Sequence, residues 1–240
     1  MKIHLSISEK GKRKIAILID PDKNNSDSLD LILQNSNISG VDYIFVGGSL
    51  VVGNINETLS YIRQRTKIPV IIFPGNVIQI SDNADGILFL SLISGRNPEY
   101  LIGQHVISAP TLKKSGIEVI PTGYILIENG KTTSVEYISN TIPIPSDKPE
   151  IVVATALAGE MLGMKLIYLE AGSGAAKSVA LSIISEVKKN IQIPILVGGG
   201  IRNAEDARKI FAAGADLIVI GSAIEENPGI IPELCLARIT

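Results

Sequence analysis

Hydrophobic residues in this chain fall into short continuous runs that recur along most of its length. A strand buried on one face alternates apolar and polar residues, whereas a parallel strand covered on both faces is continuously apolar. The runs are of the second kind, and most of them end in Gly, Ser or Asp. They are KIAILID (14–20), DYIFVGGS (42–49), PVIIFPGN (69–76), DGILFLS (85–91), KLIYLEAGSG (165–174), PILVGGGI (194–201) and DLIVIGSA (216–223).

The segments between these runs predict helices. Ser26 is a suitable N-cap for residues 26–36, and Gly214 is a suitable stop for residues 203–215. Residues 177–190 have helical spacing and a basic last turn, and residues 149–164 form a further helical segment. Strands that alternate with helices about every 25 to 30 residues indicate a parallel α/β fold.

One unit, residues 116–145, is irregular. Asn129 and Gly130 are a hairpin signal between two β-prone arms, residues 124–128 and 132–138. Counting this region gives about eight strands and predicts an α/β fold of the modified (β/α)8 TIM-barrel type, with one helix replaced by an irregular or β insertion. We predict a single domain over residues 1–240.

An open, doubly wound sheet is the alternative architecture. Two near-repeats favour a closed barrel instead. VDYIFVGGS (41–49) resembles ADLIVIGSA (215–223), and IPVIIFPGN (68–76) resembles IPILVGGGI (193–201).

Composition narrows the function classes. The 240 residues are 45% hydrophobic with a formal net charge of −2, so no basic footprint for nucleic acid or membrane is visible. No apolar run is long enough to span a bilayer, and no apolar segment follows the N-terminal charges. The single cysteine, Cys235, is typical of a cytoplasmic protein. With two histidines, any metal is expected to be a hard ion held by oxygen.

Three glycine-rich loops follow the last predicted strands, where barrels commonly bind phosphate. Residues 198–200 let backbone amides approach an anion, and Gly221 and Ser222 add an amide and a hydroxyl. Residues 171–175 form the third loop, at the start of a helix expected near Ala175. Any one loop could simply be a tight turn, but the three together predict a phosphate cradle.

Glu170 ends a buried strand directly before one of these loops. A carboxylate beside a phosphate site is unfavourable unless it serves another part of the ligand, such as accepting a proton from a hydroxyl. A capping or ion-paired carboxylate is the alternative. Tyr168, two residues earlier, points to the same side of the strand, and core packing explains it nearly as well.

Oxygen ligands also end the first two strands. Asp20 and Ser49 could share a Mg²⁺ that binds substrate phosphates, and Gly47 and Gly48 leave room for a second anion such as a diphosphate. The alternative is an ordinary turn in which Asp22 caps a helix. No lysine ends one of the predicted strands, which argues against Schiff-base chemistry.

Several of these segments together resemble the geranylgeranylglyceryl phosphate synthase family. They are LIDPDK, FVGGS, IPTGYILIENG, NTIPIPSDKPEI, LGMKLIYLEAGSGA, ILVGGGIR and IVIGSAIEENP. The resemblance covers nearly the whole chain in the right order. YLEAGSGA and KPEI…LGMK are its specific parts, because the last two glycine motifs occur in many phosphate-binding barrels.

The resemblance implies a TIM barrel with one helix replaced and a prenyltransferase of ether-lipid biosynthesis. Its reaction would join the C3 hydroxyl of sn-glycerol 1-phosphate to geranylgeranyl diphosphate and release diphosphate, with Mg²⁺. Glu170 would be the base, and Asp20 and Ser49 the metal positions. The glycerol phosphate would be bound by Tyr168, Leu169, Glu170, Ala171, Gly172, Ser173, Gly174, Gly199, Gly200, Gly221 and Ser222.

The family also implies a homo-oligomer. Residues 89–104 are a candidate for the prenyl groove, and Arg96 within them is either a diphosphate ligand or a solvated loop side chain. A peripheral contact with the membrane would suit the lipid product. Two rival functions remain at this stage: a phosphosugar isomerase of the histidine-biosynthesis barrel type, which needs a second catalytic Asp near mid-chain, and a barrel that binds a phosphometabolite without reacting it.

Overall fold

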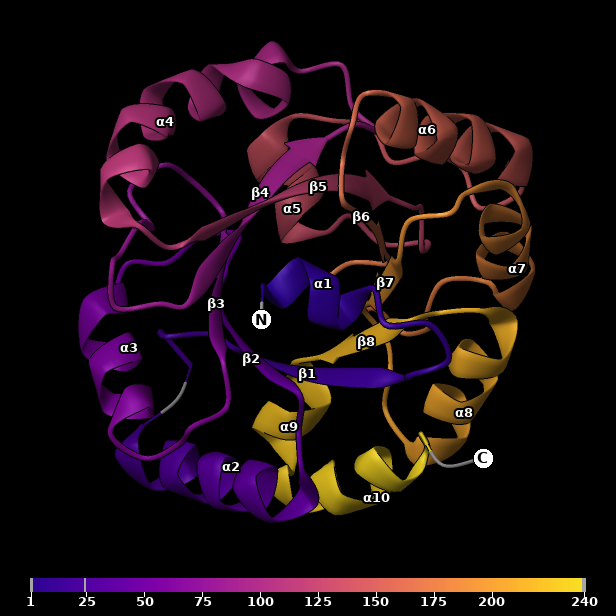
Figure 1. Cartoon of the computed structure of the whole chain (residues 1–240). Coiled ribbons are helices and arrows are strands. Elements are labelled where there is room, and N and C mark those ends of the chain that lie inside the picture. Colours follow the sequence, from indigo (N-terminus) through magenta and orange to yellow (C-terminus); the bar gives the residue numbers. More distant parts are fainter. Residues whose placement is uncertain (1, 24, 239–240) are drawn as a thin grey trace.

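The computed structural model describes residues 2–23 and 25–238, and its centre is a closed barrel of parallel strands (Figure 1). Each strand pairs with its neighbours in sequence, and the first pairs with the last. This confirms the predicted TIM barrel over the open sheet. The strands are β1 (Lys14–Ile19), β2 (Tyr43–Gly48), β3 (Val70–Pro74), β4 (Gly86–Leu92), β5 (Glu118–Leu126), β6 (Leu166–Glu170), β7 (Ile195–Gly198) and β8 (Leu217–Ile220).

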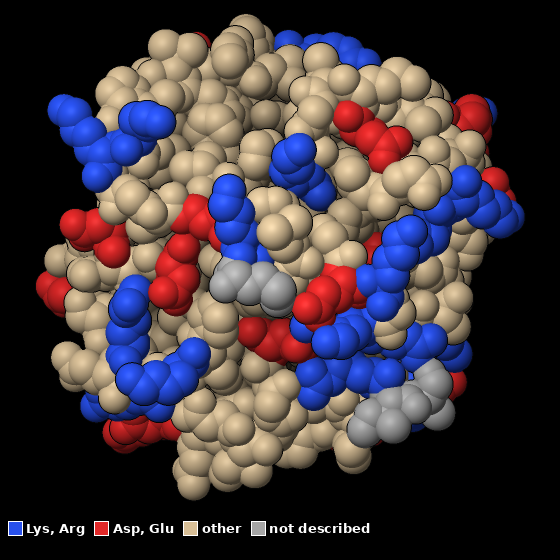
Figure 2. Space-filling view, in the orientation of Figure 1, with Lys and Arg blue, Asp and Glu red and all other residues tan. Residues whose placement is uncertain are grey.

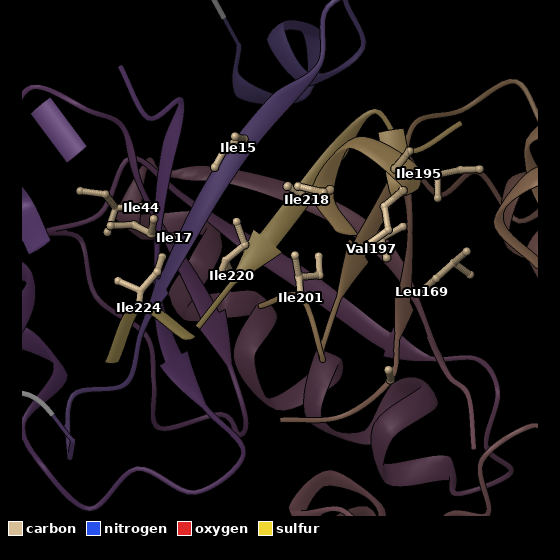
Figure 3. Packing of buried hydrophobic residues seen from close by; sticks show 14 of the residues in the cluster. Ile15, Ile17, Ile44, Leu169, Ile195, Val197, Ile201, Ile218, Ile220 and Ile224 are labelled. Carbon is tan, nitrogen blue, oxygen red and sulfur yellow. The ribbon is translucent and has the colours of Figure 1, made fainter. Parts of the chain in front are cut away.

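The strands are apolar throughout because both of their faces are buried. In β1, Ile15 and Ile17 point outward into the layer between barrel and helices, while Ala16 points into the barrel interior. Figure 3 shows part of the outer layer, where residues of β1 lie with residues of β7 and β8. In β6 the same alternation turns Tyr168 inward and Leu169 outward.

Helices surround the barrel (Figure 1). Asn25, not Ser26, caps the first long helix, because its Oδ1 accepts from the Ser28 amide at 2.9 Å. Gly214 ends α8 with φ of 116°, as predicted. The helices are α1 (Ile3–Ile7), α2 (Ser26–Ser39), α3 (Ile55–Arg63), the π-helical turn η1 (Glu99–Gly103), α4 (Gln104–Ser115), α5 (Ser134–Ser139), α6 (Pro149–Met161), α7 (Leu181–Asn190), α8 (Ala204–Ala213), α9 (Ser222–Glu226), the 3₁₀ turn η2 (Pro228–Ile230) and α10 (Ile231–Leu236).

The predicted hairpin at Asn129 and Gly130 is wrong. Its first arm is the end of β5, but its second arm forms helix α5. Thr133 and Glu136 make a capping box, in which the Thr133 hydroxyl accepts from the Glu136 amide and the Glu136 carboxylate accepts from the Thr133 amide. This reciprocal pair satisfies two amides that would otherwise lack partners at the helix start. The unit between β5 and β6 therefore contains helices α5 and α6.

The barrel does lack one helix, but at a different place, between β3 and β4. Residues 75–85 form an irregular connection instead. Gln79 fixes this connection from inside: its side-chain oxygen accepts from the Gly75 amide at 3.1 Å, and its amide donates to the Gly48 carbonyl at 3.3 Å. One flank of the barrel consequently has no helix packed directly over it.

The N-terminal ends of the strands are closed by α1, which lies across the barrel mouth facing the viewer in Figure 1. Ile3 and Ile7 enter the interior cluster, and Glu118 at the start of β5 accepts from the Ile3 amide at 2.5 Å and pairs with the His4 ring at 2.6 Å. Figure 2 shows this same face, with cationic and anionic side chains interspersed. Any deep site must therefore open at the opposite end, where the strands terminate.

The helices described here are short, and none of those in the described ranges is both long and apolar enough to cross a bilayer.

Candidate active site

The C-terminal ends of the strands surround a hollow of about 1270 Å³ that opens to solvent. Its wall is contributed by the ends of β1, β2, β6, β7 and β8 and the loops after them, together with Phe73 of β3, Tyr124 of β5 and residues of α5. Most of the residues that sequence analysis selected line this hollow. They are Asp20, Ser49, Tyr168, Glu170, Ser173, Gly174, Gly199, Gly200, Gly221 and Ser222.

Glu170 lies at the floor of this cavity and is 6% exposed. Its Oε1 accepts from the Gly172 amide at 2.6 Å, and the Tyr168 hydroxyl also hydrogen-bonds the carboxylate. Burial raises its pKa from 4.5 to about 7, and the two hydrogen bonds only partly oppose this rise. A carboxyl group with a pKa near neutrality can take up and release a proton under ordinary conditions, as general bases do.

Tyr168 is positioned by other aromatic rings. It stacks on Tyr124 of β5 with ring centroids 5.3 Å apart, and Phe73 of β3 packs edge-on against it at 5.5 Å. Burial and the nearby Glu170 charge raise the pKa of both tyrosines well above 10, so both hydroxyls remain protonated donors. Sequence analysis missed Tyr124, although its position opposite Tyr168 follows from aligning β5 with β6.

Two glycines of β7 and its loop make room for these side chains. A Cβ added to Gly198 would overlap the Tyr168 hydroxyl and lie 2.8 Å from Glu170 Oε2. A Cβ added to Gly199, which has φ of 81°, would lie 2.5 Å from Glu170 Oε1. These distances are shorter than ordinary van der Waals contacts, so the glycines at 198 and 199 are required by the carboxylate as well as by the turn.

Leu169, Ala171 and Gly172 do not line the cavity, although sequence analysis grouped them with the ligand site. Leu169 faces outward beside Val197 in the layer under the helices (Figure 3). Ala171 packs into the same layer, and Gly172 orients Glu170 through its amide. Because strand side chains alternate, a contiguous motif cannot place all of its side chains on one face.

The expected helix near Ala175 is also wrong, because α7 begins only at Leu181. Gly172 and Gly174 have φ of 101° and 71°, which interrupts helical geometry, and the loop instead packs against the β7 loop. A Cβ at Gly200 would overlap the Lys177 carbonyl. The helix that does start at the cavity is α9, immediately after Gly221. On this side the cavity therefore presents glycine-rich backbone and the serines Ser173 and Ser222, which fit the anion cradle predicted from the sequence.

Asp20 and Ser49 face the cavity from adjacent strand ends. Gly47 is required here, since a Cβ at its φ of 145° would overlap the Phe73 carbonyl. Asp22 does not cap a helix: its carboxylate accepts from the Val52 and Gly53 amides at 2.7 Å each, which ties the Asp20 turn to the loop after Ser49.

Within the described ranges, no group of three or more His, Cys, Asp or Glu side chains is arranged to hold a metal ion. Asp20 and Ser49 offer oxygen ligands from two directions, however. Mg²⁺ usually keeps several waters and binds through one or two carboxylates together with substrate phosphates. The donor set therefore fits a Mg²⁺ that arrives with a phosphorylated ligand, and it does not fit a metal held by protein alone.

A second, apolar groove of about 820 Å³ continues from the cavity. It runs where the helix between β3 and β4 is missing, with α4 as its outer wall. Ser49, Phe73, Tyr124, Val135 and Ile138 line both spaces, so the two are continuous. The remaining lining residues are Pro74, Gly75, Asn76, Val77, Ile80, Ile87, Leu88, Phe89, Leu90, Leu92, Tyr100, Gln104, His105, Ser108, Leu112 and Ser139.

Part of the predicted groove segment, residues 89–104, therefore does line this groove. Arg96 does not line either space. It donates to the carbonyls of Ile93 and Gly95, at 3.4 and 2.8 Å, which agrees with a loop side chain. Four further charged residues of the cavity were not identified from the sequence, because each lies beyond a strand end in a loop or in α9. They are Lys23, Arg202, Glu225 and Glu226.

Comparison with known proteins agrees with this geometry. The PcrB family model matches residues 8–238. The geranylgeranylglyceryl phosphate synthase of Chitinophaga pinensis is 54% identical over 226 residues, covering 94% of this chain and 90% of the relative. That of Spirosoma linguale is 50% identical over 225 residues, covering 93% and 90%.

A solved structure is similar as well. The crystal structure of (S)-3-O-geranylgeranylglyceryl phosphate synthase from Thermoplasma acidophilum, in complex with substrate sn-glycerol-1-phosphate, superimposes with a TM-score of 0.94 at 32% identity. The match covers 99% of this chain and 98% of that one.

Proposed function

Because this chain belongs to the PcrB family, we propose that it joins the C3 hydroxyl of sn-glycerol 1-phosphate to geranylgeranyl diphosphate and releases diphosphate. It is a prenyltransferase of ether-lipid synthesis. The observation that carries the assignment of roles is the position of Glu170. This buried carboxyl group lies in the cavity lined by the glycine-rich loops, and it is hydrogen-bonded to Tyr168, whose ring stacks on Tyr124 where the cavity meets the apolar groove.

The acceptor occupies the cradle in this proposal. Its phosphate accepts hydrogen bonds from the loops at Gly174, Gly200 and Gly221 and from the Ser222 hydroxyl. Its glycerol end then lies over β6, within reach of Glu170. The Thermoplasma acidophilum relative was crystallised with sn-glycerol-1-phosphate, which supports this choice of acceptor.

The prenyl donor occupies the groove. Its C20 tail lies between β4 and α4 among apolar side chains such as Ile87, Phe89 and Leu112, and burying such a chain is favourable in proportion to its apolar area. Its diphosphate lies at the groove entrance near Asp20 and Ser49. These two residues would hold Mg²⁺, which supplies positive charge to neutralise the departing diphosphate when it is bound.

The residues of the chain perform the remaining steps. Glu170, ionised, accepts the proton of the C3 hydroxyl while that oxygen bonds to C1 of the prenyl group. The C1–O bond to diphosphate breaks, and its electron pair leaves with the diphosphate. Tyr168 keeps the carboxylate in place through its hydroxyl. Gly198 and Gly199 provide the space in which the carboxylate and the acceptor meet.

An isomerase of the histidine-biosynthesis type is less compatible with the site. Such an enzyme needs a second catalytic carboxylate near mid-chain, but β5 ends at Leu126 and the nearby Glu128 faces a separate surface depression rather than the cavity. A barrel that only binds anions would gain nothing from a buried carboxyl group whose ionisation is disfavoured. We extend the proposal to a cytoplasmic homo-oligomer.

The test is a reaction panel followed by mass spectrometry. The protein receives Mg²⁺, geranylgeranyl diphosphate and either sn-glycerol 1-phosphate or its 3-phosphate enantiomer. We expect an ether product from the 1-phosphate and loss of that product in Glu170→Gln. The exposed Glu205→Gln, on α8, is the matched control. The proposal would be overturned if no ether product formed with geranylgeranyl diphosphate or with any shorter or longer prenyl diphosphate.

A further inference from the structure

We propose that Lys23 is the cation through which the protein itself binds the diphosphate of the prenyl donor, and that Glu225 holds this lysine while the site is empty. The inference rests on the proposed function, since it assigns a leaving-group ligand within the same cavity. Lys23 follows Asp20 by three residues and lines the cavity together with Ser49 and Glu225.

The geometry places the Lys23 ammonium beside the position expected for the diphosphate. Its Nζ is 3.2 Å from Asp20 Oδ2 and 3.4 Å from Glu225 Oε2. A diphosphate that binds beside Asp20 would therefore also be beside this ammonium. The Lys23 side chain is 49% exposed, whereas Asp20 and Glu225 are 16% and 17% exposed, so the lysine has room to turn toward an incoming ligand.

The backbone around Lys23 is held firmly enough to define that position. The Asp22 amide donates to Asp20 Oδ1 at 3.1 Å, and the Lys23 amide donates to the Asp20 carbonyl at 3.2 Å. The Asp22 carboxylate binds the amides of Val52 and Gly53, which follow Ser49. These bonds connect the β1 and β2 loops, so that Lys23, Asp20 and Ser49 approach one ligand from a single corner of the cavity.

Charge explains why a cation is needed here. The cavity wall contains the carboxylates Asp20, Glu170, Glu225 and Glu226, and its cationic side chains are Lys23 and Arg202. A diphosphate that enters beside Asp20 meets unfavourable charge unless a cation accompanies it. Lys23 can leave its two carboxylate partners and donate to phosphate oxygens, in the way lysines commonly bind phosphates as point charges.

Binding of inorganic diphosphate, measured by isothermal titration calorimetry, tests the proposal without requiring turnover. The titration is done with Mg²⁺ and saturating sn-glycerol 1-phosphate, so that the glycine cradle is already occupied. Loss of one hydrogen bond to a charged group corresponds to roughly a tenfold weaker affinity or more. We expect that loss in Lys23→Met and partial recovery in Lys23→Arg. Lys209→Met, which removes an exposed lysine paired with Glu205 on α8, should bind as the parent does.

Steady-state kinetics separate this role from a general structural one. Lys23→Met should raise KM for geranylgeranyl diphosphate about tenfold and leave KM for sn-glycerol 1-phosphate within about twofold. Equal diphosphate affinity in Lys23→Met and the parent would overturn the proposal, as would a change confined to the glycerol phosphate. If the parent makes no ether product but Lys23→Met still weakens diphosphate binding, the proposed function fails and the anion site stands.

Discussion

Glu170 imposes a cost on the folded protein that can be measured directly. Its carboxyl group is buried at the cavity floor, and its pKa is raised from 4.5 to about 7. Each tenfold change in an ionisation constant corresponds to about 1.4 kcal/mol, so ionising Glu170 in the folded state costs roughly 3 kcal/mol more than in the unfolded chain.

The sign of the pH dependence follows from the order of titration. Between about pH 4.5 and pH 7 the unfolded chain has released this proton while the folded protein still holds it. The free energy of unfolding therefore falls as pH rises through this window and levels off above it. Glu170→Gln has no such titration. Relative to the parent, its stability should increase by about 2 to 3 kcal/mol between pH 5 and pH 8.

Urea unfolding of the ligand-free protein at a series of pH values measures this difference. The parent, Glu170→Gln and the surface control Glu205→Gln are compared at each pH. Activity should change in the opposite sense: Glu170→Gln should lose about 10²- to 10⁴-fold in kcat, and the parent's kcat/KM should decline below about pH 7 as the base becomes protonated. If Glu170→Gln and the parent show parallel stability curves from pH 5 to pH 8, the carboxyl group does not carry the cost deduced here.

Three further substitutions probe other parts of the site. Gly198→Ala should lower kcat by about a hundredfold in a protein with unchanged circular dichroism, since the added methyl group displaces Tyr168 and Glu170. Ser108→Phe should narrow the groove, so that KM for geranylgeranyl diphosphate rises at least fivefold while KM for a C10 donor is unchanged. Ile107 faces outward, so Ile107→Phe should leave both KM values unchanged, and competition between the two donors measures the difference. Asp20→Asn should raise the Mg²⁺ concentration for half-maximal rate by about tenfold; an unchanged Mg²⁺ titration would contradict the metal assignment.

The barrel could be predicted from the sequence because the pattern that indicates a buried parallel strand repeats along the chain. Each strand is apolar on both faces, and the same pattern recurs from β1 to β8. The prediction was wrong where a short turn motif was followed by residues that start a helix. Asn129 and Gly130 resemble a hairpin turn, but the capping box at Thr133 starts a helix instead. The missing helix at residues 75–85 gave no clear signal, because its replacement is held by side chains such as Gln79 that contact distant loops.

The shared location of the candidate residues could be predicted where a motif coincides with a strand end. Glu170 ends β6, and Asp20 and Ser49 directly follow β1 and β2, so their common location results from the barrel itself. Tyr124 and Lys23 were missed because their positions in the cavity depend on the register of neighbouring strands and on a loop's path. The side chains of Leu169 and Ala171 pack away from the cavity, because a motif is contiguous while the side chains that reach one cavity alternate.

Because no helix covers the barrel between β3 and β4, substitutions that affect the groove can be separate from substitutions that affect the reaction. The groove leaves the barrel sideways along α4, whereas the proposed base, Glu170, lies on β6 beside β7. Under the proposed function, substitutions along one face of α4, at His105, Ser108 and Leu112, would therefore alter the size of hydrocarbon accepted without contacting the Glu170 carboxylate. Substrate length and bond chemistry can diverge independently in such a barrel, which makes new donor preferences accessible by single mutations.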